Sequence, residues 1–291
     1  MDTKAAPRRV WRHRTGELVL GTRTLLMGIV NVTPDSFSDG GRYFDPARAA
    51  EHALQLQDEG ADLLDFGAES TRPGSDPISA DEQLRRLLPV FRRLETRVRV
   101  PMSVDTCLSA VACECLEAGA AIVNDVSALR KDRELAAVCA RYRAGVVLMH
   151  MRGTPDTMQQ NTHYDNLLGE VGEDLRAAVS LAEEAGIVRE CIVVDPGIGF
   201  GKSYEQNYRL LGGLSRFHGL AAGVLAGPSR KGFTGEFSQA PADRRRFSTA
   251  AAVALSVLHG ADVVRVHDVA QMREVTDIID RFREIHARAD E

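Results

Sequence analysis

Residues 191–203 read CIVVDPGIGFGKS, and they contain the pattern on which the fold prediction depends. Four apolar residues are followed by Asp195, and a glycine-rich turn begins at once. A short continuous apolar run is typical of a parallel strand that is buried on both faces. The final Gly-Lys-Ser is similar to the end of a phosphate-binding loop, but that motif requires glycine where the chain has Pro196. We therefore interpret this stretch as a buried strand and its exit rather than as a nucleotide loop.

The same pattern, an apolar run and then a stretch with helical spacing, occurs eight times along the chain. The eight runs are TLLMGIVNV (24–32), ADLLDFGAES (61–70), VPMSVDT (100–106), AAIVNDVSA (120–128), AGVVLMHM (144–151), CIVVDPG (191–197), GVLAGPSRK (223–231) and ADVVRVHDV (261–269). Eight strands that alternate with eight helices predict a parallel sheet closed into a (β/α)₈ TIM barrel of the α/β class. A doubly wound open sheet is the alternative architecture with the same alternation.

Signals at the ends of the elements agree with this plan. Asp45-Pro46 is typical of a helix N-terminus, and Ser79 to Glu82 forms a capping-box sequence. Residues 10–22 have the pattern of a small hairpin that turns at Thr15-Gly16. We expect a single domain over residues 1–291. It consists of an N-terminal β-hairpin at 10–22, the barrel core at 24–269, and the last helix and a tail at 270–291.

The composition is that of an ordinary globular protein, with 44% apolar and 26% charged residues. No apolar run approaches the roughly 18 residues of a membrane span, and the basic N-terminus lacks the apolar core of a signal peptide. We therefore expect a cytoplasmic protein. The five cysteines have no metal-ligand spacing and are expected to be reduced thiols. The net charge of −5 argues against binding to nucleic acid or acidic lipid, so an anionic ligand would need a local group of cations.

Polar residues follow the apolar runs at their C-terminal ends. In a barrel these ends form one face, which is where barrel enzymes carry their catalytic residues. The polar residues are Asn31, Asp65, Glu69, Asp105, Asn124, Asp125, His150, Asp195, Ser229, Lys231, Arg265 and His267. Any one of them could simply cap the next helix, and this interpretation stays open for Glu69, Asp125 and His150. For the set as a whole we predict an enzyme with one site at the mouth of the barrel.

The charges of these residues indicate two kinds of ligand group. The Asp195 carboxylate suits a pair of N–H donors on a guanine-type heterocycle and would repel phosphate. Arg265 and His267 are two residues apart on one strand and therefore point to one face, where phosphate oxygens could bind. Ser229 to Lys231 add positive charge, although Arg230 could instead pair with a neighbouring acid.

Two segments are expected to form loops over the mouth, because residues 31–41 and 69–75 are rich in Gly, Pro, Ser, Thr and Asp. Asn31 can offer a neutral oxygen to a Mg²⁺ ion that bridges phosphates. Thr71 and Arg72 lie where a second, acidic substrate could be held.

The chain resembles the dihydropteroate synthase family from about Thr24 to Val269. The resemblance is carried by MGIVNVTPDSFSDGG, DFGAESTRPGS, MSVDT, IVNDVSA, VLMHMRG, DPGIGFGK, GPSRKGF and VVRVHDV, which occur in the family's order. It implies a TIM barrel that condenses 6-hydroxymethyl-7,8-dihydropterin pyrophosphate with p-aminobenzoate. The products would be 7,8-dihydropteroate and pyrophosphate, with Mg²⁺ as cofactor and C–O cleavage running ahead of attack. The resemblance also implies a homodimer through the last two helices.

The resemblance assigns a role to each matching position. The pterin would be bound by Asp105, Asn124, Asp195 and Lys231 and flanked by Met149 and Phe200. Pyrophosphate would lie against Asn31, Arg265 and His267, with Mg²⁺ bridging it to Asn31. The p-aminobenzoate would be held by Thr71, Arg72, Pro73 and Lys231. Catalytic roles would fall to Asp39, Lys231, Arg265 and His267, with Asp39 stabilising positive charge that develops on the pterin.

The sequence departs from the family pattern at two positions, and it leaves two other activities open. Gly232 stands where the family often has Ser, so the group that contacts the p-aminobenzoate carboxylate is not assigned; Ala68 stands where a second glycine is common. A pterin-dependent methyltransferase would share the pterin residues but has no need for STRPG, SRK and RVH together. A pterin-binding barrel without catalytic activity is the alternative that is not an enzyme.

Overall fold

The computed structural model of the protein describes residues 9–33, 45–69 and 78–289. Eight parallel strands in these residues pair in the closed order β10-β3-β4-β5-β6-β7-β8-β9. The strands are β3 (Leu25–Asn31), β4 (Leu63–Gly67), β5 (Met102–Asp105), β6 (Ile122–Asp125), β7 (Gly145–Met149), β8 (Ile192–Asp195), β9 (Gly223–Ala226) and β10 (Val263–Val266). The last strand pairs with the first, since Val263 to Val266 lie beside Leu25 to Gly28. The predicted TIM barrel is confirmed, and the open sheet is excluded.

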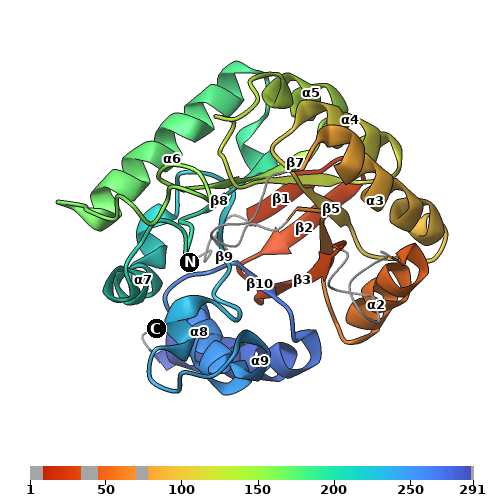
Figure 1. The fold of residues 1–291 in the computed structure, drawn as a ribbon. Helices are drawn as coiled ribbons and strands as arrows, with labels where there is room; N and C mark the ends of the chain where they lie inside the picture. Colours follow the sequence, from red (N-terminus) through yellow and green to blue (C-terminus); the bar gives the residue numbers. More distant parts are fainter. Residues whose placement is uncertain (1–8, 34–44, 70–77, 290–291) are drawn as a thin grey trace, which may run out of the picture.

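Helices follow the strands and surround the barrel (Figure 1). They are α2 (Pro46–Asp58), α3 (Ala80–Leu94), α4 (Ser109–Glu117), α5 (Glu134–Tyr142), α6 (Leu167–Glu184), α7 (Tyr204–Leu211), α8 (Arg246–Leu258) and α9 (Val269–Ala289), with short 3₁₀ turns η1 (Arg189–Cys191), η2 (Leu214–Phe217), η3 (Gly232–Gly235) and η4 (Ala242–Arg244). Asp45 caps α2 as predicted, because its Oδ1 accepts from Ala47 N at 2.8 Å. Ser79 caps α3, but the Glu82 carboxylate pairs with Arg85 and Arg86, which leaves the capping box half formed.

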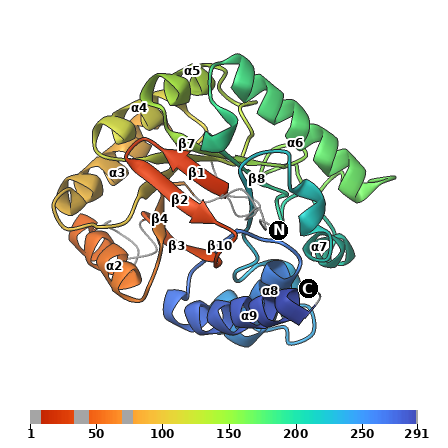
Figure 2. The ribbon, with the colours of Figure 1, turned by 180° about the vertical axis from the view of Figure 1, so that it is seen from behind.

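A hairpin covers one end of the barrel, as Figure 2 shows from behind. It consists of β1 (Arg9–His13) and β2 (Gly16–Leu20). Gly16 already pairs with His13, so the turn is Arg14-Thr15, one residue before the prediction; two-residue turns are the commonest hairpin connection. Trp11 is fully buried, and its Nε1 donates to the Cys191 carbonyl at 3.0 Å. The hairpin therefore fills the N-terminal end and leaves the C-terminal end for a site.

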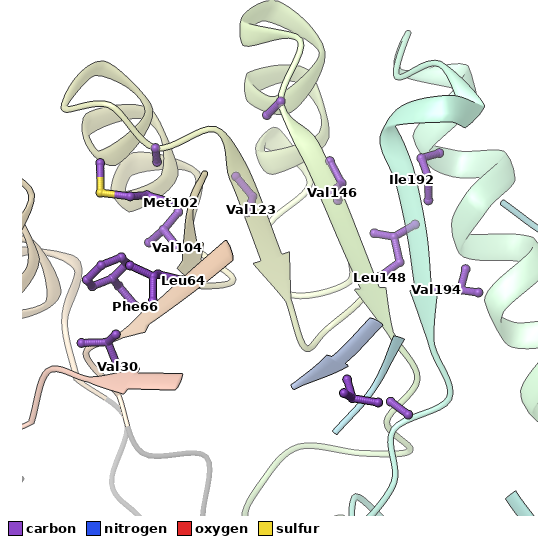
Figure 3. Packing of buried hydrophobic residues seen from close by; sticks show 14 of the residues in the cluster. Val30, Leu64, Phe66, Met102, Val104, Val123, Val146, Leu148, Ile192 and Val194 are labelled. Atoms are coloured by element: carbon purple, nitrogen blue, oxygen red, sulfur yellow. The ribbon is translucent and has the colours of Figure 1, made fainter. Parts of the chain in front are cut away.

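The strands bury both of their faces, which explains their continuous apolar runs. One set of side chains fills the barrel interior beneath Trp11, including Met27, Leu63 and Val147. The alternate set packs against the helices, and Phe66 and Val104 are among those labelled in Figure 3. The rigid barrel therefore holds the strand ends, and the side chains on them, in fixed positions.

The described residues answer two further expectations. None of their helices has the length and apolar character needed to cross a lipid bilayer. All five cysteines are free thiols, as expected. Burial raises the pKa of both Cys115 and Cys139 to about 12, so these thiols stay protonated near neutral pH.

Candidate active site

Three polar residues predicted to contact the pterin lie at the C-terminal ends of β5, β6 and β8. Asp105 ends β5 and is the register partner of Asn124 in the neighbouring β6. Asp195 ends β8 and pairs with Met149 of β7. All four side chains are buried or half-buried. The topology thus brings residues that are far apart in sequence to one edge of the barrel.

Arg265 on β10 connects the strand ends of this group to β4. Its Nε donates to Asp65 Oδ2 at 2.7 Å, and its Nη2 donates to Asp105 Oδ2 at 2.9 Å. The Asn124 amide donates to the same Asp65 oxygen at 2.9 Å. Two nitrogens of the guanidinium are thus bound to acids, and Nη1 makes no hydrogen bond within the described residues. The sequence marked Asp65 as a strand-end residue but did not reveal that it holds Arg265 and Asn124 in place.

Burial shifts the protonation of the acids at the mouth. It raises the pKa of Asp105 to about 7, with Arg265 opposing and Asp65 adding to the shift. It raises the pKa of Asp195 to about 6, against the Gly197 N–H, which donates to Asp195 Oδ1 at 2.7 Å, and against Lys231. Burial, with Arg265 beside it, lowers the pKa of Lys231 to about 8. Near pH 7 the site therefore presents an ionised Asp195 together with a charged Lys231.

Met149 and Phe200, which were expected to flank the pterin, lie in one apolar cluster. Lys231 Nζ lies 3.7 Å from the centre of the Phe200 ring, which is a cation–π contact. The lysine passes over Gly199, where an added Cβ would come within 2.9 Å of Lys231 Cδ. The sequence did not single out the other buried members of this cluster, Val126, Met151 and Met158.

Lys202, the lysine of the Gly-Lys-Ser sequence, is only 2% exposed. Its Nζ donates to the carbonyls of Gly197 and Phe200, at 3.1 and 2.9 Å, and lies 3.0 Å from His150 Nδ1. All three N–H donors therefore have partners inside the protein, and none is left for a phosphate. The prediction that this stretch is not a nucleotide loop is consistent with that arrangement.

The exits of β9 and β10 are joined to each other. Ser229 Oγ lies 2.9 Å from His267 Nδ1 and accepts from His267 N at 3.3 Å. Arg230 donates to both carboxylate oxygens of Asp268, at 3.1 and 2.8 Å. Arg230 thus forms the ion pair with a neighbouring acid that the sequence left open, and its charge is compensated there.

The three residues for which a structural role stayed open all have partners. Asp125 accepts from the backbone N–H groups of Ser127 and Leu129, and Glu69 accepts from the Gln83 amide at 3.0 Å. His150 lies 3.1 Å from the Asp174 carboxylate on α6. Asp125 and Glu69 therefore stabilise the loops around the site.

The remaining predicted residues surround the mouth or are not described. Asn31 ends β3 beside Gly67 and is half-buried. Asp39, Thr71, Arg72 and Pro73 lie outside the described residues. The described residues hold no group of three His, Cys, Asp or Glu side chains that could bind a metal alone. Asn31 offers one neutral side-chain oxygen at this edge of the barrel, a type of ligand that Mg²⁺ accepts together with water and phosphate oxygens.

Fold and site together define a barrel enzyme with acids that suit an N–H-rich heterocycle and cations on neighbouring strands. A family model described as pterin binding enzyme matches residues 27–267. The chain is 42% identical over 261 residues to a dihydropteroate synthase of Synechocystis sp., covering 89% of this chain and 90% of the other. The chain belongs to the pterin binding enzyme family, among the dihydropteroate synthases.

Solved structures agree with that placement. A structure of Xanthomonas albilineans dihydropteroate synthase with 4-aminobenzoic acid has a TM-score of 0.87 and 41% identity, and it covers 96% of this chain and 99% of that one. A structure of the Xanthomonas albilineans enzyme in complex with 7,8-dihydropteroate has a TM-score of 0.81 and 40% identity, and it covers 91% and 96%.

Proposed function

We propose that the protein condenses 6-hydroxymethyl-7,8-dihydropterin pyrophosphate with p-aminobenzoate to give 7,8-dihydropteroate and pyrophosphate. The observation that carries the proposal is the charge arrangement at the mouth. Asp105, Asn124 and Asp195 line one part of it, and Lys231 and Arg265 lie on the neighbouring strand exits. The proposal is supported by the relatives, whose solved complexes contain 4-aminobenzoic acid or 7,8-dihydropteroate. Neither a methyltransferase nor a silent binding barrel is favoured by these similarities.

One group of residues recognises the pterin, and a second group stabilises the charge of the leaving pyrophosphate. Ionised Asp195 accepts from the 2-amino and N3 edge of the pterin, and Lys231 donates to the ring carbonyl and N5 side. Asn31, His267 and Arg265, whose Nη1 has no hydrogen bond to the part of the chain that the structure describes, lie where the leaving pyrophosphate would gain charge. The aniline nitrogen of p-aminobenzoate is itself nucleophilic, so no strong general base is required.

The magnitude of the electrostatic effect depends on how far water is excluded. Two unit charges about 4 Å apart interact by about 1 kcal/mol in water and by about 4 kcal/mol at an effective dielectric constant of about 20. These energies correspond to about fivefold and about a thousandfold in rate. We propose that Asp39 contributes in this way, by stabilising positive charge on the pterin when the mouth is closed. Asn31 is the residue proposed to hold Mg²⁺, whose charge would help to neutralise the leaving pyrophosphate.

The purified protein should release pyrophosphate and form 7,8-dihydropteroate when both substrates and Mg²⁺ are present. We expect no pyrophosphate release when p-aminobenzoate is omitted, and loss of turnover when EDTA removes the metal. Chromatography of the product and a coupled pyrophosphate assay measure the two outcomes. Binding of the pterin without product would instead support the silent barrel, and full turnover in EDTA would reject the magnesium proposal.

We also propose that the protein is a homodimer through α8 and α9, which lie side by side in both Figures 1 and 2. Ile278, Phe282 and Ile285 form a stripe at helical spacing on α9, with 70%, 47% and 50% of their surface exposed. Leu255 and Leu258 on α8 are each 40% exposed. Apolar side chains gathered on adjacent helices suit a two-fold contact in which the same surface meets itself.

Changing Phe282 to Glu should convert the dimer into a folded monomer, because a charge buried at the contact has no partner. Sedimentation velocity would measure the change as a halved mass, with circular dichroism showing that the fold is kept. Val188→Glu is the matched control, since Val188 is 52% exposed but lies outside α8 and α9. A wild-type protein that sediments as a monomer at micromolar concentration would reject the proposal.

A further inference from the structure

We propose that Lys202 is a positioning residue of the pterin site, which holds the loop from Gly197 to Gly201 against the exit of β7. The inference rests on the proposed function, because it concerns the pterin that this loop would contact. Lys202 itself would not touch the substrate, since its ammonium group is enclosed by protein acceptors.

The loop needs an external hold because its backbone is permissive. Gly197, Gly199 and Gly201 have φ values of +72°, +82° and +61°, and glycine adopts such values with little preference for any one shape. Two of the loop's carbonyls, those of Gly197 and Phe200, accept from Lys202. A separate bond, from Gly199 N to Asn207 Oδ1 at 2.6 Å, fixes the other side of the loop to α7.

The loop directly contacts residues that are proposed to bind the pterin, so its position determines theirs. The Gly197 N–H donates to Asp195 Oδ1 at 2.7 Å, and the carbonyl of the same residue accepts from Lys202. A shift of Gly197 would therefore turn the carboxylate that receives the heterocycle. Phe200 carries the ring beneath Lys231, so a shift there would also move the cation.

His150 anchors the lysine to the preceding strand exit. Its Nδ1 accepts from Lys202, so Nε2 carries the hydrogen and donates to Asp174 on α6. Burial, with Lys202 beside it, lowers the pKa of His150 to about 2, so the ring is a neutral acceptor. The contact is close, since a Cβ at Gly197 would lie 1.8 Å from the His150 carbonyl oxygen. A series of hydrogen bonds from Asp174 through His150 and Lys202 to Gly197 thus connects helix α6 to the pterin site.

Lys202→Met tests the inference, because methionine keeps the length of the side chain and removes all three donors. We expect the KM for the pterin pyrophosphate to rise about tenfold or more, because the buried carbonyls of Gly197 and Phe200 lose the donor that satisfies them. The KM for p-aminobenzoate, measured at saturating pterin, and kcat should change less, by about threefold at most, because they depend on this loop only through the contact between Phe200 and Lys231. Loss of stability alone would lower all activity together and would not separate the two substrates.

Arg273→Met is the matched control. Arg273 is also a mostly buried cation, and it donates to the carbonyls of Thr24 and Gly60 and to Asp62, but at the N-terminal end of the barrel. The Arg273→Met variant should have a lower unfolding temperature than the wild type and an unchanged KM for the pterin pyrophosphate. An unchanged pterin KM in Lys202→Met, or a parallel loss in both variants, would overturn the inference.

A further variant decides the matter if Lys202→Met does not fold. Lys202→Gln keeps two N–H donors without the charge, and the same criteria apply to it with a smaller rise in the pterin KM. The wild-type assay separates this inference from the proposed function. A wild type that makes no 7,8-dihydropteroate contradicts the function, whereas an active wild type with a normal Lys202 variant contradicts the positioning role alone.

Discussion

Asp195→Asn should abolish detectable pterin binding while the barrel stays folded. The Gly197 N–H donates to Asp195 Oδ1 at 2.7 Å, and an asparagine oxygen can keep that bond. The asparagine NH₂ would then face one N–H donor of the pterin. One of the two charge-assisted bonds is thereby replaced by two donors that face each other, and the other bond loses its charge. With each such bond contributing about 1.5–3 kcal/mol, the dissociation constant should rise by roughly two to four orders of magnitude. Calorimetry with 6-hydroxymethylpterin measures this loss.

The pH dependence of Asp195 gives an independent measure of the same assignment. Its pKa is raised by burial to about 6, above the value of 3.8 for an exposed carboxyl. The folded protein therefore holds this proton more tightly than the unfolded chain, and ionised Asp195 lowers stability above pH 6. Asp195→Asn should then be at least as stable as the wild type at pH 8, and wild-type affinity for the pterin should fall below about pH 6. Unchanged affinity in the variant would reject the role of Asp195.

The position of Asp195 was predictable because it depends on chain topology. A short apolar run marks a buried parallel strand, and a closed parallel barrel brings every strand exit to one face. Asp105, Asn124 and Arg265 were therefore placed at the same mouth from their runs alone. Local signals also sufficed for the start of α2, since Asp45 and Pro46 are adjacent in sequence.

The choice of partners was not predictable in this way. Arg265 and Asp65 are separated by 200 positions, and only the closed barrel shows that they share a hydrogen bond. Lys202 and His150 are separated by 52 positions, and whether the lysine turns inward depends on which carbonyls the glycine loop offers it. Strand ends can be read from a pattern, but hydrogen bonds between them depend on rotamers and on neighbours in space.

Arg265→Ala should have the second large effect, on stability as well as on binding. It leaves Asp65, which is fully buried, with Asn124 as its only partner among the described residues, and it removes the cation beside Asp105. Breaking a buried ion pair by removing one partner costs about 3–5 kcal/mol of unfolding free energy. Urea unfolding at pH 8 measures this loss, and Arg265→Lys is the matched control, which keeps the charge but replaces the planar fork of donors with a single nitrogen.

The pH dependence of that loss separates electrostatics from packing. Without Arg265 the folded-state pKa of Asp105, which burial already raises to about 7, rises further because the guanidinium that opposes the shift is gone. The folded variant therefore takes up protons more readily than the unfolded chain. Its unfolding free energy should therefore increase as the pH falls from 8 to 5, more steeply than that of the wild type. A loss that is equal at both pH values would show that packing around the side chain matters more than its charge.

Arg265→Ala should weaken binding of the pterin pyrophosphate more than binding of the pterin without its diphosphate. At pH 8, removal of the arginine makes the cluster of Arg265, Asp65 and Asp105 more negative by up to one charge, less the part that Asp105 neutralises by taking up a proton. The bare hydroxymethylpterin is neutral and should lose affinity only through the displaced Asp105 and Asn124. The pterin pyrophosphate is also repelled by the more negative cluster, so its dissociation constant should rise at least about tenfold more than that of the bare hydroxymethylpterin. Lowering the salt concentration should widen this difference between the two ligands. Equal losses for both ligands would place the pyrophosphate away from β10, because a diphosphate bound beside Arg265 must respond to the charge that this residue removes.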